Sequence, residues 1–337
     1  LFEREDIPGI ADQPTTRGQL LGTLHAFDGR LHLGYGDYSE NTGPIAMNAW
    51  DPGEGAWVYL GTLATEEVQW FRPFGEYLLV PSTDPDAHQG EGGVYRLPCG
   101  GLWDESTTIA GAVHVYDVAI QGDTIYAGTG SLTAEPAQLM ASTNLGDTWQ
   151  EVLRKDSEAE KFSRFYFAGA TSTQLFVSGR DHPDPVNSFA WLREGDGEFT
   201  PLSDPPSNSL VPIILGEDMV IAQWSGDPGR GSYLASYRIE GTSFVEDAPW
   251  PPGRLVNWGP DADPERLLVL IETADETYEV HRTASLAGTP QWELMLTLDD
   301  LPGDGYASMA LLLNDLYLGT NNGDLWVVRE FASPAGG

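Results

Sequence analysis

The sequence predicts an all-β fold built from seven similar units. A short apolar run recurs along the chain at steps of 47, 47, 50, 45, 48 and 48 residues, beginning at Leu31, Leu78, Ile125, Leu175, Val220, Leu268 and Leu316. The 337 residues include 39 Gly and 24 Pro, and no long stretch keeps a helical period of apolar residues. A repeat of this length is typical of a four-stranded blade. We therefore predict a seven-bladed β-propeller with four-stranded blades.

Each unit is expected to begin with an inner strand, and the recurrent apolar run then forms its second strand. The inner strands are predicted at 20–27, 68–74, 113–120, 163–167, 210–215, 255–258 and 308–313. Turns containing Gly, Asp and Asn separate the third and fourth strands, because tight hairpins need residues that accept a positive φ. The final unit has room for three strands only. We expect a segment within residues 1–10 to complete it and close the ring, with residues 1–337 forming one domain.

Composition excludes several classes of partner. The chain has 17 Lys and Arg against 51 Asp and Glu, a net charge of −34, which repels nucleic acid and anionic membrane surfaces. No run of about twenty apolar residues is present, so we expect no membrane span. The single Cys99 excludes an intramolecular disulfide and a thiolate metal cluster. We expect a monomer that is secreted or displayed at the cell surface after removal of a signal peptide, since the chain starts at Leu1 without a basic-then-apolar leader.

One motif carries a family resemblance. The segment Ser142-Thr-Asn-Leu-Gly-Asp-Thr-Trp149 resembles the Asp-box, the Ser/Thr-x-Asp-x-Gly-x-Thr-Trp turn of BNR-repeat and sialidase-like β-propellers. Asn144 stands where that family has Asp. The pattern has a physical basis, because an Asx side chain folds back on turn amides, Gly accepts a positive φ and Trp packs between sheets. The resemblance implies a propeller fold and places the box between third and fourth strands, away from a catalytic face.

The propeller topology predicts where a site would form. The N-terminal ends of inner strands and the loops between second and third strands emerge on one face, here called the upper face. We expect catalytic groups there at His114, Tyr166, Arg164 and Arg180. Ligand-binding side chains are predicted at His88, His182, Tyr35, Asp37, Arg72, Trp224, Arg254 and Tyr306. The indoles nearest the channel, at Trp70, Trp224 and Trp258, are the candidates for stacking on a sugar ring.

Two functions remain open at this point. One is recognition of a glycan or protein ligand on the upper face without turnover. The other is cleavage of a polysaccharide, by a lyase rather than a hydrolase, because Arg would neutralise a uronate carboxylate while His or Tyr moves protons. The same Tyr and Arg side chains would also suit packing between blades. No cofactor or metal is required, although oxygen ligands at Asp84, Asp86, Asp181 and Asp184 leave calcium as an alternative.

Overall fold

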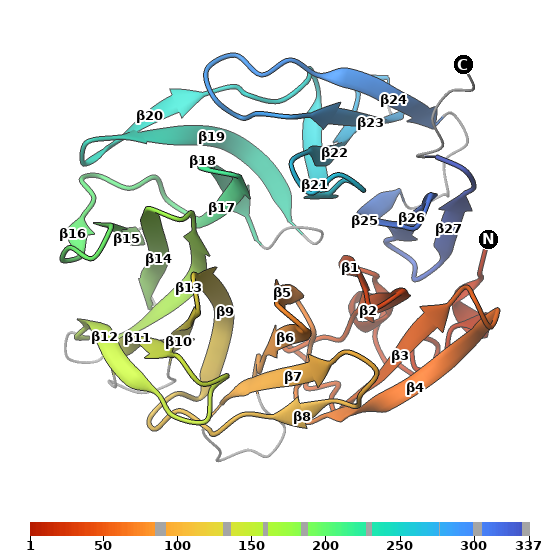
Figure 1. Ribbon diagram of the computed structural model, residues 1–337, viewed down its shortest axis with the longest axis horizontal. Coiled ribbons are helices and arrows are strands. Elements are labelled where there is room, and N and C mark those ends of the chain that lie inside the picture. The colour runs from red at the N-terminus through yellow and green to blue at the C-terminus, as the bar shows by residue number, and fades with distance from the viewer. Residues whose placement is uncertain are drawn as a thin grey trace.

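The structure is a computed structural model that describes residues 1–84, 92–130, 136–157, 161–182, 188–226, 231–275, 277–298 and 305–331. Antiparallel sheets are arranged around a central axis, and β27 lies beside the N-terminus (Figure 1). In each sheet, the first strand along the chain lies nearest the axis (Figure 1). The fold is thus all-β with a propeller arrangement.

Four sheets contain four strands each, in the order of the sequence. The first contains β1 (Thr23–Phe27), β2 (Arg30–Gly34), β3 (Ile45–Asp51) and β4 (Ala56–Leu63). The second contains β5 (Arg72–Phe74), β6 (Tyr77–Pro81), β7 (Val94–Pro98) and β8 (Asp104–Glu105). The third contains β17 (Ser209–Leu215), β18 (Asp218–Ser225), β19 (Ser232–Glu240) and β20 (Ser243–Asp247). The fourth contains β21 (Arg254–Pro260), β22 (Leu267–Glu272), β23 (Tyr278–Thr283) and β24 (Glu293–Leu298).

The two remaining sheets differ in size. The larger has eight strands: β9 (His114–Gln121), β10 (Thr124–Gly130), β11 (Ala137–Ser142), β12 (Gln150–Lys155), β13 (Phe162–Ala170), β14 (Gln174–His182), β15 (Ser188–Glu194) and β16 (Thr200–Pro201). The smaller has three: β25 (Tyr306–Leu312), β26 (Asp315–Thr320) and β27 (Leu325–Val328). Among the described residues, helical structure is limited to the 3-10 turn η1 (Arg4–Asp6) and the short α1 (Thr16–Gln19). No helix within the described ranges is long and apolar enough to cross a membrane.

The predicted division into seven separate four-stranded blades is wrong. Hydrogen bonding among the described residues defines five sheets of four or more strands and one of three. The recurrent apolar runs do form strands, namely β2, β6, β10, β14, β18, β22 and β26, and each pairs with the strand before it. Two neighbouring units merge, however, because Gly130 of β10 pairs with Arg164 of β13. Glycine has no side chain to keep the two backbones apart.

The N-terminal segment pairs with the last sheet, as expected, but it does not form a full fourth strand. Phe2 exchanges two backbone hydrogen bonds with Leu325 of β27, at 2.8 and 3.0 Å, and this is an isolated bridge rather than a strand. The chain then turns into η1, which ends the pairing. Ile7 and Ile10 follow, and both are fully buried.

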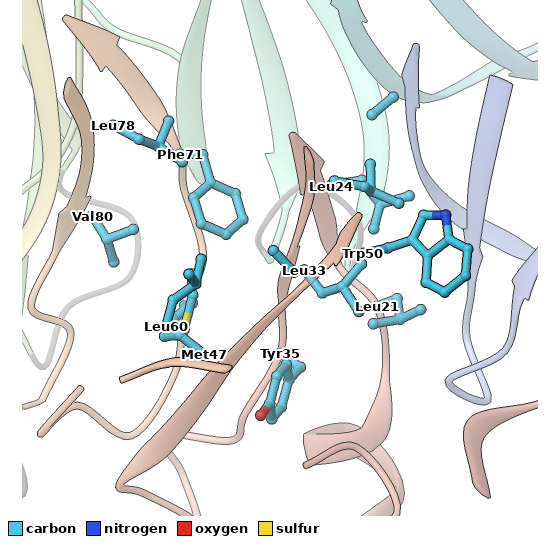
Figure 2. Close-up of a cluster of buried hydrophobic side chains, with 14 of the residues drawn as sticks. Leu21, Leu24, Leu33, Tyr35, Met47, Trp50, Leu60, Phe71, Leu78 and Val80 are labelled. Atoms are coloured by element: carbon cyan, nitrogen blue, oxygen red, sulfur yellow. The ribbon is translucent and has the colours of Figure 1, made fainter. Parts of the chain in front are cut away.

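A hydrophobic cluster fills the space between the first two sheets and the N-terminal segment. Figure 2 shows side chains from β1 to β4 and from the strand region around β5 and β6 converging on this core. Tyr35, Met47 and Leu33 are each at most 1% exposed. Facing apolar sides of neighbouring sheets are buried against each other, which stabilises the radial arrangement by the hydrophobic effect.

The Asp-box-like turn lies between β11 and β12, as the resemblance implied. The Ser142 hydroxyl oxygen accepts a hydrogen bond from the Gly146 N–H at 2.8 Å, and Asn144 Oδ1 accepts one from the Thr148 N–H at 3.0 Å. Gly146 has a φ of +86°. The Trp149 indole N–H donates to the Thr107 carbonyl of the neighbouring sheet's connection at 2.9 Å. Asn144 therefore replaces the Asp of the motif in its structural role.

Candidate functional site

A cavity of about 340 Å³ opens where β9, β13 and β14 begin or end on the upper face. We call it the upper cavity. Its described lining is Tyr38, Gln69, Thr83, Asp84, His114, Tyr116, Arg164, Tyr166, Phe167, Arg180, His182 and Gly226. Most of these residues are polar or aromatic, and they come from sequence segments more than a hundred residues apart. Cavities of this size hold small ligands or parts of polymers.

Two β-bulges direct tyrosines into the upper cavity. The register of β9 against β10 shifts at Tyr116, and the register of β13 against β14 shifts at Tyr166. A bulge leaves its extra residue unpaired and re-aims the side chain. The two rings consequently lie next to each other, with centroids 4.6 Å apart.

The Tyr166 side chain contacts a histidine and two arginines of the upper cavity. Its hydroxyl is 2.6 Å from His182 Nε2, and an Arg164 guanidinium nitrogen donates to it at 3.4 Å. The Arg180 guanidinium lies 4.9 Å from the centre of the Tyr166 ring. Burial lowers the pKa of His182 to about 4, and the positive charges of Arg164 and Arg180 act in the same direction. His182 is therefore a neutral imidazole at neutral pH, hydrogen-bonded to a phenol.

His114 lies at the start of β9 and is 4% exposed. Burial, and then the charge of Arg164, lower the pKa of His114 to about 3, so this imidazole is also neutral at neutral pH. Its Nδ1 is 3.8 Å from an Asp84 carboxylate oxygen, too far for a hydrogen bond. Burial raises the pKa of Asp84. Both ring nitrogens of His114 lack a hydrogen-bond partner among the described residues.

Buried polar atoms without partners gather around the upper cavity. Besides the two nitrogens of His114, they include the Tyr116 hydroxyl, the Arg180 Nε and the Thr83 hydroxyl, considering the described part of the chain. Buried polar groups in folded proteins are nearly always hydrogen-bonded, and those without a partner call for a ligand or water. Burial also raises the pKa of Tyr116 well above its usual value, so its phenol stays protonated. The upper cavity is thus preformed for a polar ligand.

The structure brings together all four predicted catalytic residues and one predicted ligand-binding residue. His114, Arg164, Tyr166, Arg180 and His182 line the upper cavity. Their proposed roles remain predictions. His88 lies outside the described residues, as do Asp86 and Asp184 of the suggested calcium ligands.

Three other predicted ligand-binding residues are buried in the protein core. Tyr35 is 1% exposed and donates a short hydrogen bond to the Ala46 carbonyl. Trp224 is completely buried and packs against Trp258 and Tyr233. Tyr306 is 2% exposed and packs edge-on against Tyr278 at 5.2 Å. None of them lines the upper cavity.

The other three predicted ligand-binding residues are engaged in ion pairs. Asp37 accepts a hydrogen bond from Thr15 at 2.9 Å and lies 3.5 Å from the Arg17 Nε. Arg72 forms a two-pronged interaction with the buried carboxylate of Asp117, at 2.9 and 3.0 Å. Arg254, the first residue of β21, pairs with Glu272 at the end of β22. Contacts with other residues of the protein therefore account for these three charged side chains without a ligand.

Sequence reasoning missed Tyr116, although a signal was present. Tyr116 and Tyr166 are 50 residues apart, the same step that separates the apolar runs at Ile125 and Leu175. Aligning the repeats would have placed both tyrosines at one structural position. Thr83 was also missed, since it lies in the loop after β6, where no repeat position marks it. Asp84 was suggested above only as a calcium ligand.

A metal site is not evident in the part of the chain that the structure describes. No group of three or more His, Cys, Asp or Glu side chains is close enough there to hold an ion. Asp181, one of the suggested calcium ligands, accepts a hydrogen bond from Ser163 at 2.6 Å and pairs with Lys155 at 3.4 Å.

Comparison with known proteins defines the class of fold. No protein-family model and no curated protein matches the sequence. Solved structures do match, including a GH74 enzyme of Niastella koreensis, with a TM-score of 0.57 and 14% identity over 94% of this chain and 53% of that one. The chain therefore spans about half the length of the GH74 enzyme.

Two further structures are matched over nearly their whole length. A PL25 ulvan lyase gives a TM-score of 0.53 with 13% identity, over 92% of each chain. The WD40 propeller domain of Doa1 gives 0.54 with 12% identity, over 92% of this chain and 93% of that one. At such identities the likeness shows the fold alone. This chain is a protein of the β-propeller class.

Proposed function

We propose that the upper cavity binds a uronate residue of a polysaccharide and cleaves the polymer by β-elimination. One observation carries this proposal. Two arginines, a neutral His114 without partners and the hydrogen-bonded pair of Tyr166 and His182 line a single cavity. An anion-binding group and two neutral proton carriers are the groups that this reaction requires.

The charge of the upper cavity favours an anion. Arg164 and Arg180 face one carboxylate, Asp84, among the lining residues that the structure describes. Among the described lining residues the two guanidinium groups outnumber the one carboxylate, although the chain as a whole has a net charge of −34. Guanidinium groups bind carboxylates through charge-assisted hydrogen bonds. A uronate carboxylate therefore fits the upper cavity better than a neutral sugar does.

The bound carboxylate makes the elimination possible. Its neutralisation by Arg164 and Arg180 acidifies the hydrogen on the adjacent C5 of the uronate. A base removes that proton, the C5–H electron pair becomes the C4–C5 double bond, and the C4–O bond to the next sugar breaks. An acid protonates the departing oxygen. Water is not consumed, and the new chain end is unsaturated.

We assign the base role to His114 and the acid role to Tyr166. The unprotonated ring nitrogen of neutral His114 has no hydrogen-bond partner among the described residues and can accept a proton. A bound carboxylate would raise the pKa of His114, because a nearby negative charge favours the imidazolium. The Tyr166 hydroxyl would give its proton to the departing oxygen, and His182, 2.6 Å from that hydroxyl, would hold the phenol in place. His182 is thus a positioning residue for Tyr166.

One of the structural neighbours is compatible with the proposal of a lyase. The PL25 ulvan lyase matches along 92% of both chains, and one of its structures is bound to -[GlcA(1-4)Rha3S]-. That ligand contains a uronate. We also propose a distant relationship to Asp-box propellers, supported by the turn from Ser142 to Trp149.

The test is an assay for unsaturated chain ends. Polymers of glucuronate, galacturonate and sulfated rhamnose-glucuronate are offered in turn, and absorbance in the near ultraviolet is followed. We expect one of them to give product with the natural chain. Tyr166→Phe and His114→Ala should each reduce the rate by about 100-fold or more, as for loss of a general acid or base.

Matched variants control for the chemical change itself. Tyr126→Phe removes a phenol that bonds Arg193 away from the upper cavity, and His281→Ala removes an imidazole that bonds Glu279. Both should retain the natural rate. Binding of a uronate polymer without product would show a recognition module instead, and equal losses in the control variants would contradict the assigned roles.

A further inference from the structure

A second cavity, also of about 340 Å³, lies at the opposite end of the central channel. We call it the lower cavity. Thr23 to His25 of β1 and Arg72 and Pro73 of β5 line one part of it. Most of the other strand residues of its lining come from C-terminal halves of innermost strands, including Val118 to Ile120 of β9 and Ala168 to Ala170 of β13. The same strands line the upper cavity with their N-terminal halves. The proposed function makes no use of the lower cavity.

An aromatic layer separates the two cavities. Phe167 lines the upper cavity, whereas Trp70 and Trp258 line the lower one. The rings of Trp70 and Phe167 meet edge to face at 6.1 Å, and those of Trp70 and Trp258 lie 6.4 Å apart. Trp224 also packs against Trp258, with ring centroids 6.2 Å apart. A ligand in one cavity therefore cannot thread into the other without displacing packed indoles.

The lower cavity is electrically balanced, unlike the upper one. Arg72 is held by the buried Asp117, and the Arg266 Nε lies 3.2 Å from Asp263. His25 lines the cavity as well, and burial lowers its pKa to about 4, so it is neutral at neutral pH. Each cation that lines the described cavity thus has a carboxylate partner. A charged ligand would therefore gain little electrostatic stabilisation in the lower cavity.

Aromatic faces and neutral donors define what would fit. Trp258 is only partly buried and presents ring surface to the lower cavity. The Trp70 indole N–H is buried and has no hydrogen-bond partner among the described residues. Asn257 uses its Oδ1 to accept from the Met309 N–H at 3.2 Å, which leaves its NH₂ group for a ligand. Pyranose rings have an apolar face for an indole and hydroxyls for such donors.

We propose that the lower cavity binds a neutral sugar ring, stacked on Trp258 and hydrogen-bonded by Trp70 and Asn257. This site is independent of the upper cavity and of the chemistry proposed there. It gives the propeller a second carbohydrate contact on the opposite face, with a preference for uncharged residues.

Titration of tryptophan fluorescence with cellobiose, maltose and L-rhamnose tests the proposal, with glucuronate as the charged comparison. We expect one of the neutral sugars to bind and glucuronate not to compete with it. Trp258→Ala should weaken that binding by about tenfold or more, and Trp258→Tyr should restore part of it. Asn257→Asp keeps the acceptor for Met309 but removes the donor, so it should also weaken binding and serves if Trp258→Ala does not fold.

Upper-cavity variants separate this proposal from the proposed function. Tyr166→Phe should bind the neutral sugar as the natural chain does, whether or not the protein proves to be a lyase. Three results would overturn the lower site: no neutral sugar binds at millimolar concentration, Trp258→Ala and Asn257→Asp leave binding unchanged, or Tyr166→Phe abolishes it.

Discussion

Gly130 shows how one residue shapes the upper cavity. A Cβ atom at this position would lie 2.6 Å from Arg164 Cγ and 2.9 Å from Tyr116 Cε2, so Gly130→Ala must displace both side chains. We expect a loss of product formation of about tenfold, with a fall in the free energy of unfolding of about 1–3 kcal/mol from overpacking. Gly53→Ala, in an exposed turn, is the control. Full activity in Gly130→Ala would contradict the assignment of this cavity as the active site.

His32 makes stability depend on pH. It is 2% exposed among Phe27, Phe71 and Trp103, and burial lowers its pKa to about 3. The unfolded chain binds a proton near pH 6.5 and the folded chain does not. The stabilising contribution is therefore present above pH 6.5 and is lost as the pH falls toward 3. His32→Phe should reduce the slope of unfolding free energy against pH by about 1.4 kcal/mol per pH unit between pH 6 and 4. Denaturant titrations at several pH values measure these slopes, and equal slopes for the natural chain and His32→Phe would refute the prediction.

At the scale of elements, Asp117 joins three innermost strands. Its carboxylate is fully buried, receives two hydrogen bonds from Arg72 of β5 and accepts from the Ala168 N–H of β13 at 3.2 Å. Asp117→Asn should lower the free energy of unfolding by about 2–3 kcal/mol, since it leaves a partly buried guanidinium without its counter-charge. Asp104→Asn, in an exposed pair with Arg96, should cost less than about 1 kcal/mol. Urea denaturation distinguishes the two, and equal losses would count against a special role for Asp117.

The strands themselves were largely predictable, but their division into sheets was not. Apolar runs bounded by Gly, Asp and Asn identified β2 and its equivalents because hydrophobic periodicity and turn chemistry are local properties. The bridge between Gly130 and Arg164 depends on how neighbouring units approach each other in space. Local sequence does not encode that approach.

Because local sequence does not show which side chains meet in space, the site was also predicted only in part. Residues on the inner strands, such as His114 and Tyr166, were placed correctly on one face because the topology fixes which strand ends lie there. Arg72 and Arg254 were predicted as ligand contacts, yet each has a carboxylate partner on a neighbouring strand. Such partners are distant in sequence, so the sequence cannot distinguish a paired guanidinium from an available one.

For the whole molecule, the N-terminal segment is expected to be a structural part of the propeller. Phe2 packs on Trp50 at 4.7 Å, and Ile10 is fully buried beside the first sheet. Removal of residues 1–10 should lower the free energy of unfolding by more than about 3 kcal/mol, and Ile10→Ala alone by about 2–4 kcal/mol. Leu1→Ala, at a position that is 61% exposed, should have almost no effect. An unchanged thermal midpoint after the deletion would contradict this account.

Elimination and hydrolysis differ in the mass of the products formed from a uronate polymer in water enriched with heavy oxygen, and mass spectrometry measures that difference. Elimination at the upper cavity breaks the C4–O bond without consuming water. We therefore predict fragments whose masses sum to that of the substrate, with no heavy oxygen and one unsaturated end. Fragments whose masses sum to that of the substrate plus one water, with heavy oxygen at the new end and no unsaturated end, would show hydrolysis and contradict the proposed roles of Arg180, His114 and Tyr166.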